Sequence, residues 1–164
     1  MPIPEHMLRA AAGRRANLSR SIAEAKRTKP SAFLSHSHAD RELAVGLQVL
    51  LIEHGWDVYL DWQDGAMPAK PTKVTASRIK QKIAENDWFI FFATTRSQAS
   101  RWCPWEIGFA DRAKGTGKIL LVQTTTSAGS EYLQLYRSIA QTTDNDLAVF
   151  DPGRTDGGIA LQRF

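Results

Sequence analysis

The chain has 164 residues, of which 43% are hydrophobic and 23% charged, which is typical of one globular domain with a sizeable core. Cys103 is the only cysteine in the sequence, which excludes an internal disulfide framework. The sequence has no apolar run near the roughly 20 residues of a membrane-spanning helix, and its start lacks the charged-then-apolar pattern of a secretory leader. We therefore expect a cytoplasmic protein with no membrane span.

Positive charge is concentrated at the N-terminus. The formal charge of the whole chain is +4, but residues 1–30 hold seven Lys or Arg against two Glu, an excess of +5. The remaining residues are nearly neutral, with 14 basic and 15 acidic side chains. Such a segment can bind nucleic acid or an acidic partner, or it can be the solvated face of a helix. We favour the solvated face and do not expect a nucleic-acid partner.

The same N-terminal segment has the periodicity of a helix over residues 5–28. Its apolar positions, among them Leu8, Leu18 and Ile22, recur at spacings of three, four and seven. This narrow stripe is typical of a helix that docks on its own domain or on another subunit. Pro30 ends it, because the residue before a proline disfavours helical backbone. We therefore predict a basic helical extension over 1–30 and a folded domain over 31–164.

From residue 31 onward, strand and helix patterns alternate. The apolar run at 88–93 does not alternate with polar residues, as expected for a central parallel strand that is covered on both faces. The predicted strands are 31–35, 56–60, 88–93, 118–122 and 147–150. The predicted helices begin near Asp40 and Thr75 and within 97–114, with a shorter one over 132–139.

Repeated strand–helix units predict an α/β fold with a flavodoxin-like, doubly wound, parallel five-stranded sheet, helices on both faces and an additional N-terminal helix. Ligands of such folds bind beyond the carboxyl ends of the strands. Three loops should therefore meet at one edge of the sheet. They are the segments that follow the first, second and third strands.

The segment after the third strand carries two residues that are suited to ligand binding or catalysis. Trp102 and Glu106 are four residues apart, which puts them on one helix face, one turn from each other. A carboxylate beside an indole is partly desolvated, which suits a group that holds a hydroxyl or stabilises a developing cation. The indole offers a flat apolar surface for an aromatic ring of a ligand.

Three motifs in this order resemble the TIR (Toll/interleukin-1 receptor) domain family, in particular its free-standing prokaryotic, NAD-cleaving type. Residues 33–40, Phe-Leu-Ser-His-Ser-His-Ala-Asp, look like the first strand and loop of TIR domains. Residues 55–61, Gly-Trp-Asp-Val-Tyr-Leu-Asp, look like their second strand. Trp102 and Glu106 fit the Trp-x-x-x-Glu signature. The resemblance covers residues 31–150.

The resemblance implies an NAD⁺ glycohydrolase or ADP-ribosyl cyclase, with NAD⁺ as substrate and with neither a cofactor nor a metal. It gives Glu106 the catalytic role and implies release of nicotinamide with ADP-ribose or a cyclic or variant ADP-ribose messenger. It further implies homo-oligomers through TIR–TIR contacts, a possible sensor or effector protein as partner, and a role in anti-phage defence. The residues that it implies for substrate binding are Trp102, Ser35, His36, Tyr59, Asp61 and Trp62.

Other interpretations stay open at this stage. A non-enzymatic TIR adaptor that acts by self-association is the main alternative, although an adaptor does not need the Trp102–Glu106 pair. His36, His38 and Asp40 could suggest a metal site, but three ligands from one short loop with no fourth in view favour a solvated polar loop. The loop 61–72 lacks a clear form of the family's acidic-Gly-x-x-Ile pattern, which leaves the mode of assembly open.

Overall fold

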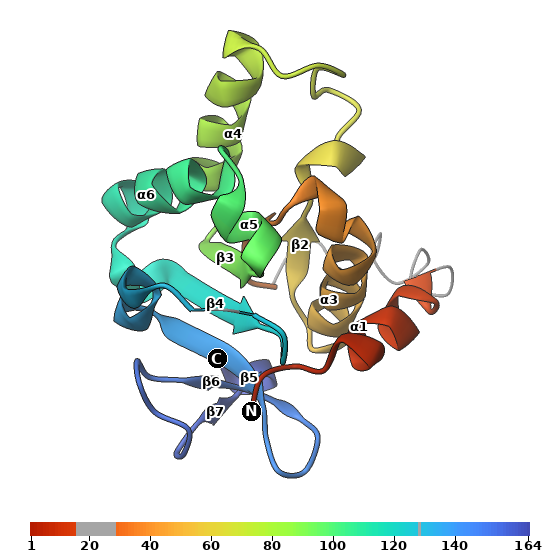
Figure 1. The fold of residues 1–164 in the computed structure, drawn as a ribbon, viewed down its shortest axis with the longest axis vertical. Helices are drawn as coiled ribbons and strands as arrows, with labels where there is room; N and C mark the ends of the chain where they lie inside the picture. Colours follow the sequence, from red (N-terminus) through yellow and green to blue (C-terminus); the bar gives the residue numbers. More distant parts are fainter. Residues whose placement is uncertain (16–28, 128) are drawn as a thin grey trace.

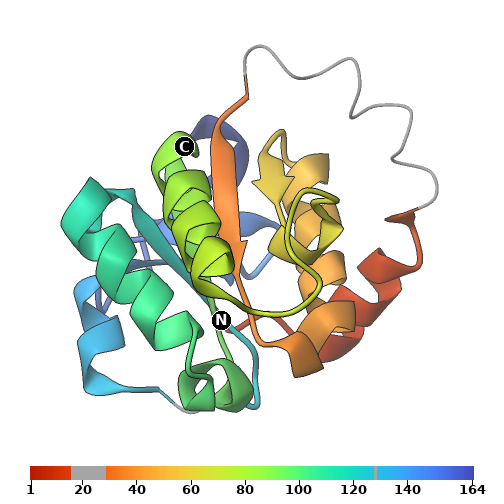
Figure 2. The ribbon, with the colours of Figure 1, turned by 90° about the horizontal axis from the view of Figure 1, so that it is seen from above.

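The computed structural model describes residues 1–15, 29–127 and 129–164, which form one sheet with helices on both faces (Figures 1 and 2). The α-helices of the described residues are α1 (Glu5–Ala12), α3 (Arg41–Glu53), α4 (Lys73–Glu85), α5 (Thr95–Ala99) and α6 (Cys103–Lys114). The strands are β1 (Ser31–Ser35), β2 (Asp57–Tyr59), β3 (Trp88–Ala93), β4 (Ile119–Gln123), β5 (Arg137–Gln141), β6 (Leu147–Phe150) and β7 (Ile159–Ala160). Short 3₁₀ turns connect several of these elements.

The strand order confirms the predicted fold class. The sheet runs β2-β1-β3-β4-β5-β6-β7, and the five strands from β2 to β5 are mutually parallel. This 2-1-3-4-5 order is that of flavodoxin-like, doubly wound folds. Its switch point lies at β1, which pairs with β2 on one side and with β3 on the other. The crevice expected for a ligand therefore lies beyond the carboxyl ends of β1, β2 and β3.

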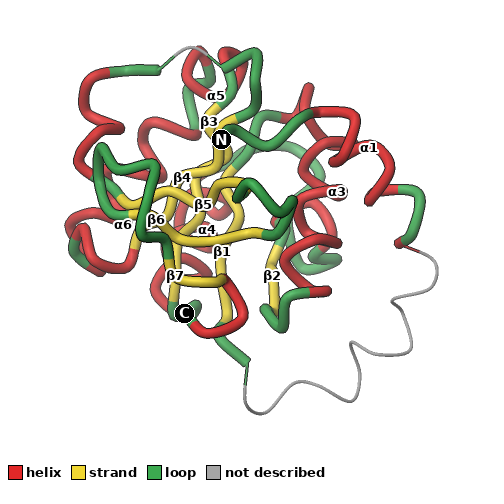
Figure 3. Tube along the Cα trace, turned by 90° about the horizontal axis from the view of Figure 1, so that it is seen from below, coloured by secondary structure: helices red, strands yellow, loops and turns green. Residues whose placement is uncertain are grey.

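Figure 3 shows helices on either side of the strands, and two hydrophobic cores lie between these helices and the two faces of the sheet. β3 is buried at every position and contributes to both cores. Ile90 and Phe92 belong to the core under α3, whereas Phe89 and Phe91 belong to the core under α4 and α6. The continuous apolar run of β3 follows from this double coverage, since successive side chains of a strand point to opposite faces.

The prediction of five strands is wrong, because the C-terminal part adds an antiparallel edge. A helix was predicted over 132–139, but only Glu131–Leu135 forms a 3₁₀ turn, and Arg137–Gln141 forms β5. The predicted last strand is β6, which pairs antiparallel with β5 and with β7. The reason is a tight hairpin between β5 and β6, in which Asn145 takes a left-handed φ of 62° and its N–H donates to the carbonyl of Thr142 at 3.2 Å.

The first residues of the chain pack on the same core as α3. Leu8 and Ala11 of α1 are fully buried, and Ile3 pairs in parallel just beyond the end of β4, donating its N–H to the carbonyl of Gln123 at 2.9 Å. α1 and α3 approach so closely that only a glycine fits at position 46. The prediction of one continuous helix over 5–28 is wrong, because α1 ends at Ala12 with Gly13 as its C-cap and a turn follows. Leu18 and Ile22 lie outside the described residues, and the domain boundary at residue 30 stays a prediction.

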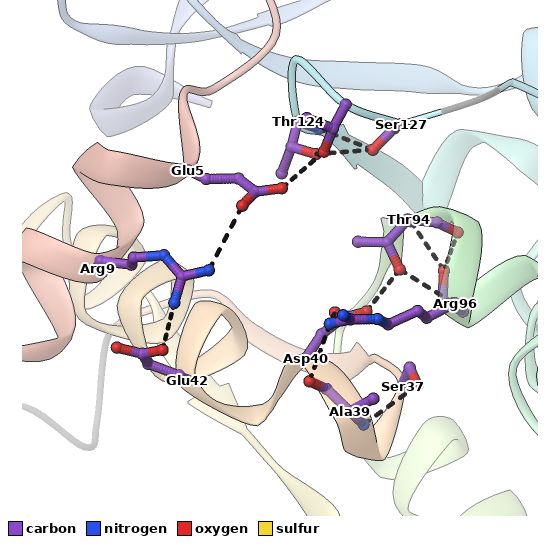
Figure 4. A network of polar contacts seen from close by, with 12 residues as sticks. Glu5, Arg9, Ser37, Ala39, Asp40, Glu42, Thr94, Arg96, Thr124 and Ser127 are labelled. Atoms are coloured by element: carbon purple, nitrogen blue, oxygen red, sulfur yellow. Dashed lines mark hydrogen bonds and ion pairs between the residues drawn. The ribbon is translucent and has the colours of Figure 1, made fainter.

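A polar network also joins α1 to its surroundings, as Figure 4 shows. Glu5 accepts a hydrogen bond from Thr126 Oγ1 at 2.6 Å and pairs with Arg9 at 3.5 Å. Arg9 in turn pairs with Glu42 of α3. These side chains are largely exposed, so the network adds little stability. The network orients α1, whereas apolar packing against the core holds the helix in place.

Candidate functional site

Loops from the carboxyl ends of β1, β2 and β3 surround a cavity of about 530 Å³. The expectation that these three segments meet at one sheet edge is therefore confirmed. Five of the seven predicted site residues line the cavity, namely His36, Asp61, Trp62, Trp102 and Glu106. The other two, Ser35 and Tyr59, lie behind its wall and act through residues that reach it.

Glu106 lies in the first turn of α6 and is 5% exposed. Ser35, at the end of β1, donates its hydroxyl hydrogen to Glu106 Oε2 at 2.5 Å. Burial raises the pKa of Glu106 to about 7, the hydrogen bond from Ser35 opposes this rise, and the negative charge of Asp61 adds to it. A carboxyl group that titrates near neutral pH beside a cavity is typical of an active site.

Trp102 immediately precedes α6 and is partly buried against the core below it. Its carbonyl accepts the backbone N–H of Glu106 at 2.8 Å, so the two residues of the Trp-x-x-x-Glu motif are one hydrogen-bonded helical turn apart. Trp102 also packs edge-on against Trp105, with ring centroids 5.7 Å apart. The indole is thereby fixed as a wall of the cavity beside Glu106.

His36 and Trp62 line the cavity as a hydrogen-bonded pair. The indole N–H of Trp62 donates to His36 Nε2 at 3.0 Å, and His36 Nδ1 lies 3.2 Å from the carbonyl oxygen of Leu34. Burial lowers the pKa of His36, so the ring is neutral at neutral pH and donates from Nδ1 to that carbonyl. Both ring nitrogens are engaged, which disfavours a metal at His36.

The remaining polar residues of the same loop are also engaged. Asp40 is 3% exposed, and its carboxylate accepts hydrogen bonds from Thr94 and Arg96. Within the described parts of the chain, no group of three or more His, Cys, Asp and Glu side chains could hold a metal ion. The loop is therefore better explained as a structural link between β1 and β3 than as a metal centre.

Asp61 and Tyr59 have different relations to the cavity. Asp61 lines it and accepts the backbone N–H of Trp62 at 2.9 Å, which fixes the turn that carries the indole. Tyr59 packs on Phe33 and donates its hydroxyl hydrogen to Asp64 Oδ2 at 2.7 Å. Burial and this hydrogen bond raise the pKa of Tyr59. Tyr59 therefore supports the loop behind the cavity instead of lining it.

Sequence reasoning did not identify two parts of the lining. One is an apolar wall, made by Met67, Pro68, Ala69 and Pro71 from the loop after β2 together with Ile79 of α4. The other is a pair of arginines, Arg41 at the start of α3 and Arg96 at the start of α5. The two arginines follow β1 and β3 closely in the sequence, and this position could have been used to predict that they line the cavity.

Residues 32–148 match the family model described as "TIR domain". This chain belongs to the TIR domain family. A curated relative is the "Probable 3' cyclic ADP-D-ribose synthase ThsB'" of Bacillus cereus (strain MSX-D12), which is 33% identical over 117 residues. The alignment covers 68% of this chain and 61% of the relative, so this TIR protein spans less than two thirds of the length of that relative. The family resemblance expected from the three motifs is confirmed.

The buried carboxyl of this TIR domain should make its stability depend on pH. Glu106 has a pKa of about 7 in the folded state against an ordinary value of 4.5. Between these values the unfolded chain loses the proton while the folded chain keeps it, so the contribution of Glu106 to the free energy of unfolding falls as pH rises and is level outside that window. Glu106→Gln removes this dependence. Relative to the parent protein it should gain up to about 3 kcal/mol between pH 4.5 and pH 8, measured by urea unfolding at several pH values.

The parent protein at pH 4.5 is the internal control, because there the carboxyl is protonated in the folded state and half protonated in the unfolded state. Parallel pH profiles for the two proteins would contradict the prediction. They would mean that Glu106 is solvated in the folded state, which would remove the electrostatic argument for its role.

Proposed function

We propose that this TIR domain cleaves NAD⁺ at the nicotinamide–ribose bond, with Glu106 as the catalytic carboxylate. The observation that carries the proposal is a carboxyl group 5% exposed that nevertheless borders a cavity of about 530 Å³ and has a pKa of about 7. A protein gains no stability from burying such a group without a cation to pair with it, which favours a functional reason for its place.

The chemistry requires a negative group where positive charge develops. When the nicotinamide–ribose bond breaks, its electron pair leaves with nicotinamide as a neutral pyridine, and the ribose becomes an oxocarbenium-like cation. A nearby carboxylate stabilises that cation, as in glycoside cleavage. Water then adds to the cation and loses a proton to give ADP-ribose, or a hydroxyl or ring nitrogen of the same molecule adds to give a cyclic product.

The surroundings of Glu106 support this role. The approach of a cationic nicotinamide ring favours the ionised carboxyl, which lowers a pKa of about 7 in the complex. Ser35 donates to one carboxylate oxygen and leaves the other for the substrate. The Trp102 indole supplies a flat surface for the pyridine or adenine ring and restricts the access of water to the cation.

We further propose a cyclic ADP-ribose as the main product. The relative is named a probable 3' cyclic ADP-D-ribose synthase, and a cavity with an apolar wall and two indoles suits a substrate folded back on itself. A part in prokaryotic anti-phage defence, a sensor or effector partner and a cytoplasmic location are proposals that rest on the family resemblance. The described residues include no helix long and apolar enough to cross a membrane.

Incubation of the purified protein with NAD⁺, followed by chromatography of the products, tests the proposal. We expect nicotinamide together with a product that has the mass of ADP-ribose less one water. If nicotinamide and ADP-ribose are the only products, the proposed cleavage is supported and the proposed cyclic product is contradicted. NAD⁺ left intact at high protein concentration would contradict the enzyme and favour the adaptor, which acts by TIR–TIR self-association alone.

Self-association should also control the activity. The loop that forms the apolar wall has exposed residues at 69–72, where a second copy of the chain can contact it. We expect the specific activity to rise with protein concentration, in parallel with the fraction of oligomer measured by sedimentation. A constant specific activity across a hundredfold range of concentration, with a monomer throughout, would contradict this expectation.

A further inference from the structure

Arg96 is held at the cavity by an unusual arrangement of charge, which Figure 4 shows. Its side chain is 63% exposed, whereas its partner Asp40 is 3% exposed. Arg96 Nη1 donates to Asp40 Oδ1 at 2.9 Å and to the carbonyl of Ala39 at 3.3 Å. Thr94 Oγ1 donates to the other oxygen of Asp40 at 2.6 Å. A buried carboxylate therefore fixes the direction of an exposed guanidinium group.

These contacts occupy only one end of the guanidinium. Both hydrogen bonds from Arg96 use Nη1, while the planar group also carries donors on Nη2 and Nε. A guanidinium fixed at one end presents the remaining donors in a set geometry, which favours the oxygens of a phosphate group. Pairing with Arg96 compensates the buried charge of Asp40, but this structural role does not use the donors on Nη2 and Nε.

The side chains that line the cavity carry charges of both signs. The acidic residues are Asp61 and Asp64 from the segment after β2 and Glu106 on α6, whereas Arg41 and Arg96 begin α3 and α5. Asp61 is the charged neighbour that acts on Glu106. Arg41 acts on His36, as Asp61 also does, and stacks over the Trp62 ring at 5.2 Å.

A dinucleotide with a cationic nicotinamide ring and an anionic diphosphate carries a counterpart for the acidic and for the basic lining residues. We propose that Arg96, fixed by Asp40 and assisted by Arg41, binds a phosphate group of the substrate, so that the site selects nicotinamide compounds that carry phosphate. This inference rests on the function proposed above for the same cavity. It adds a specificity-determining residue outside the Trp-x-x-x-Glu motif and assigns Asp40 as its positioning residue.

A series of substrates with increasing phosphate content tests the inference. NAD⁺, nicotinamide mononucleotide and nicotinamide riboside share the scissile bond but carry two, one and no phosphate groups. In Arg96→Gln we expect KM for NAD⁺ to rise at least about tenfold, the loss of one charge-assisted contact, with the riboside unaffected. Arg96→Lys should lose less, because it keeps the charge without the planar fork.

Arg101→Gln is the matched control. Arg101 is an exposed arginine between α5 and α6 that does not line the cavity, so KM for all three substrates should stay at the parent value. An equal loss on all three substrates in Arg96→Gln would overturn the inference, since it would mark a general effect on the loop. An unchanged KM for NAD⁺ would also overturn it.

Binding of ADP, measured by calorimetry, separates this inference from the proposed function because it needs no turnover. We expect Arg96→Gln to weaken ADP binding at least about tenfold and to leave adenosine binding unchanged. If ADP binding depends on Arg96 but the protein does not cleave NAD⁺, the proposed function is refuted and the phosphate site is supported. If the protein cleaves NAD⁺ but ADP binding is unchanged in Arg96→Gln, the phosphate site is refuted and the proposed function is supported.

Discussion

Glu106→Gln is expected to lower the rate of nicotinamide release by about 100- to 1,000-fold, the usual cost of removing a preorganised electrostatic group from an active site. Glutamine has nearly the same shape and can still accept the hydrogen bond from Ser35, so the cavity should keep its form. Only the negative charge that stabilises the ribosyl cation is lost. The measurement is the initial rate of nicotinamide release from NAD⁺, followed by chromatography.

Glu131→Gln provides the matched control, because it makes the same chemical change at an exposed position outside the cavity lining. We expect the parent rate in that variant. Parent-like turnover in a well-folded Glu106→Gln protein would refute the catalytic role of this residue. The unfolding profiles described above show in the same protein whether the fold has been retained.

Gly46→Ala is expected to lower the free energy of unfolding by about 3 kcal/mol, at the upper end of the range for overpacked cores. A β-carbon at position 46 would lie 1.9 Å from the carbonyl oxygen of Leu8 and 2.5 Å from its carbonyl carbon. These atoms are backbone, so α1 as a whole must move away from α3. The movement would expose Leu8 and Ala11, both fully buried in the parent protein.

Gly108→Ala is the matched control for this substitution. Gly108 also lies within a helix, α6, but a β-carbon there has nothing within 4 Å. Alanine at that position should stabilise the protein by up to about 1 kcal/mol through helix propensity alone. Urea unfolding of the two variants compares them directly. Equal effects would contradict the close packing of α1 on α3.

Local sequence patterns were sufficient to predict the strands and the helix that surround the cavity. The uninterrupted apolar run at 88–93 predicted a central parallel strand, and β3 has those same bounds. Because the carboxyl ends of parallel strands share one edge, the order of the motifs also placed His36, Asp61 and Glu106 around one cavity. The four-residue spacing of Trp102 and Glu106 is one helical turn, so it too could be read without a structure.

The prediction for the C-terminal part was wrong because its local sequence is compatible with both a helix and a strand. The apolar spacing at 132–139 fits a short helix, yet a polar turn allows Arg137–Gln141 to pair with the following strand. Pairing with β4 on one side and β6 on the other satisfies both edges of this segment. A short helix over this segment would have left one edge of β4 without a strand partner.

The sequence by itself determined the class of fold, the family and the carboxylate on which the proposed chemistry depends, because periodicity and motif spacing are properties of neighbouring residues. Only the tertiary structure decided how that carboxylate is buried and which side chains serve it. Ser35 reaches Glu106 across 71 positions, and Asp40 reaches Arg96 across 56. Such contacts follow from the strand register and from the packing of helices on the sheet, and no local pattern specifies either.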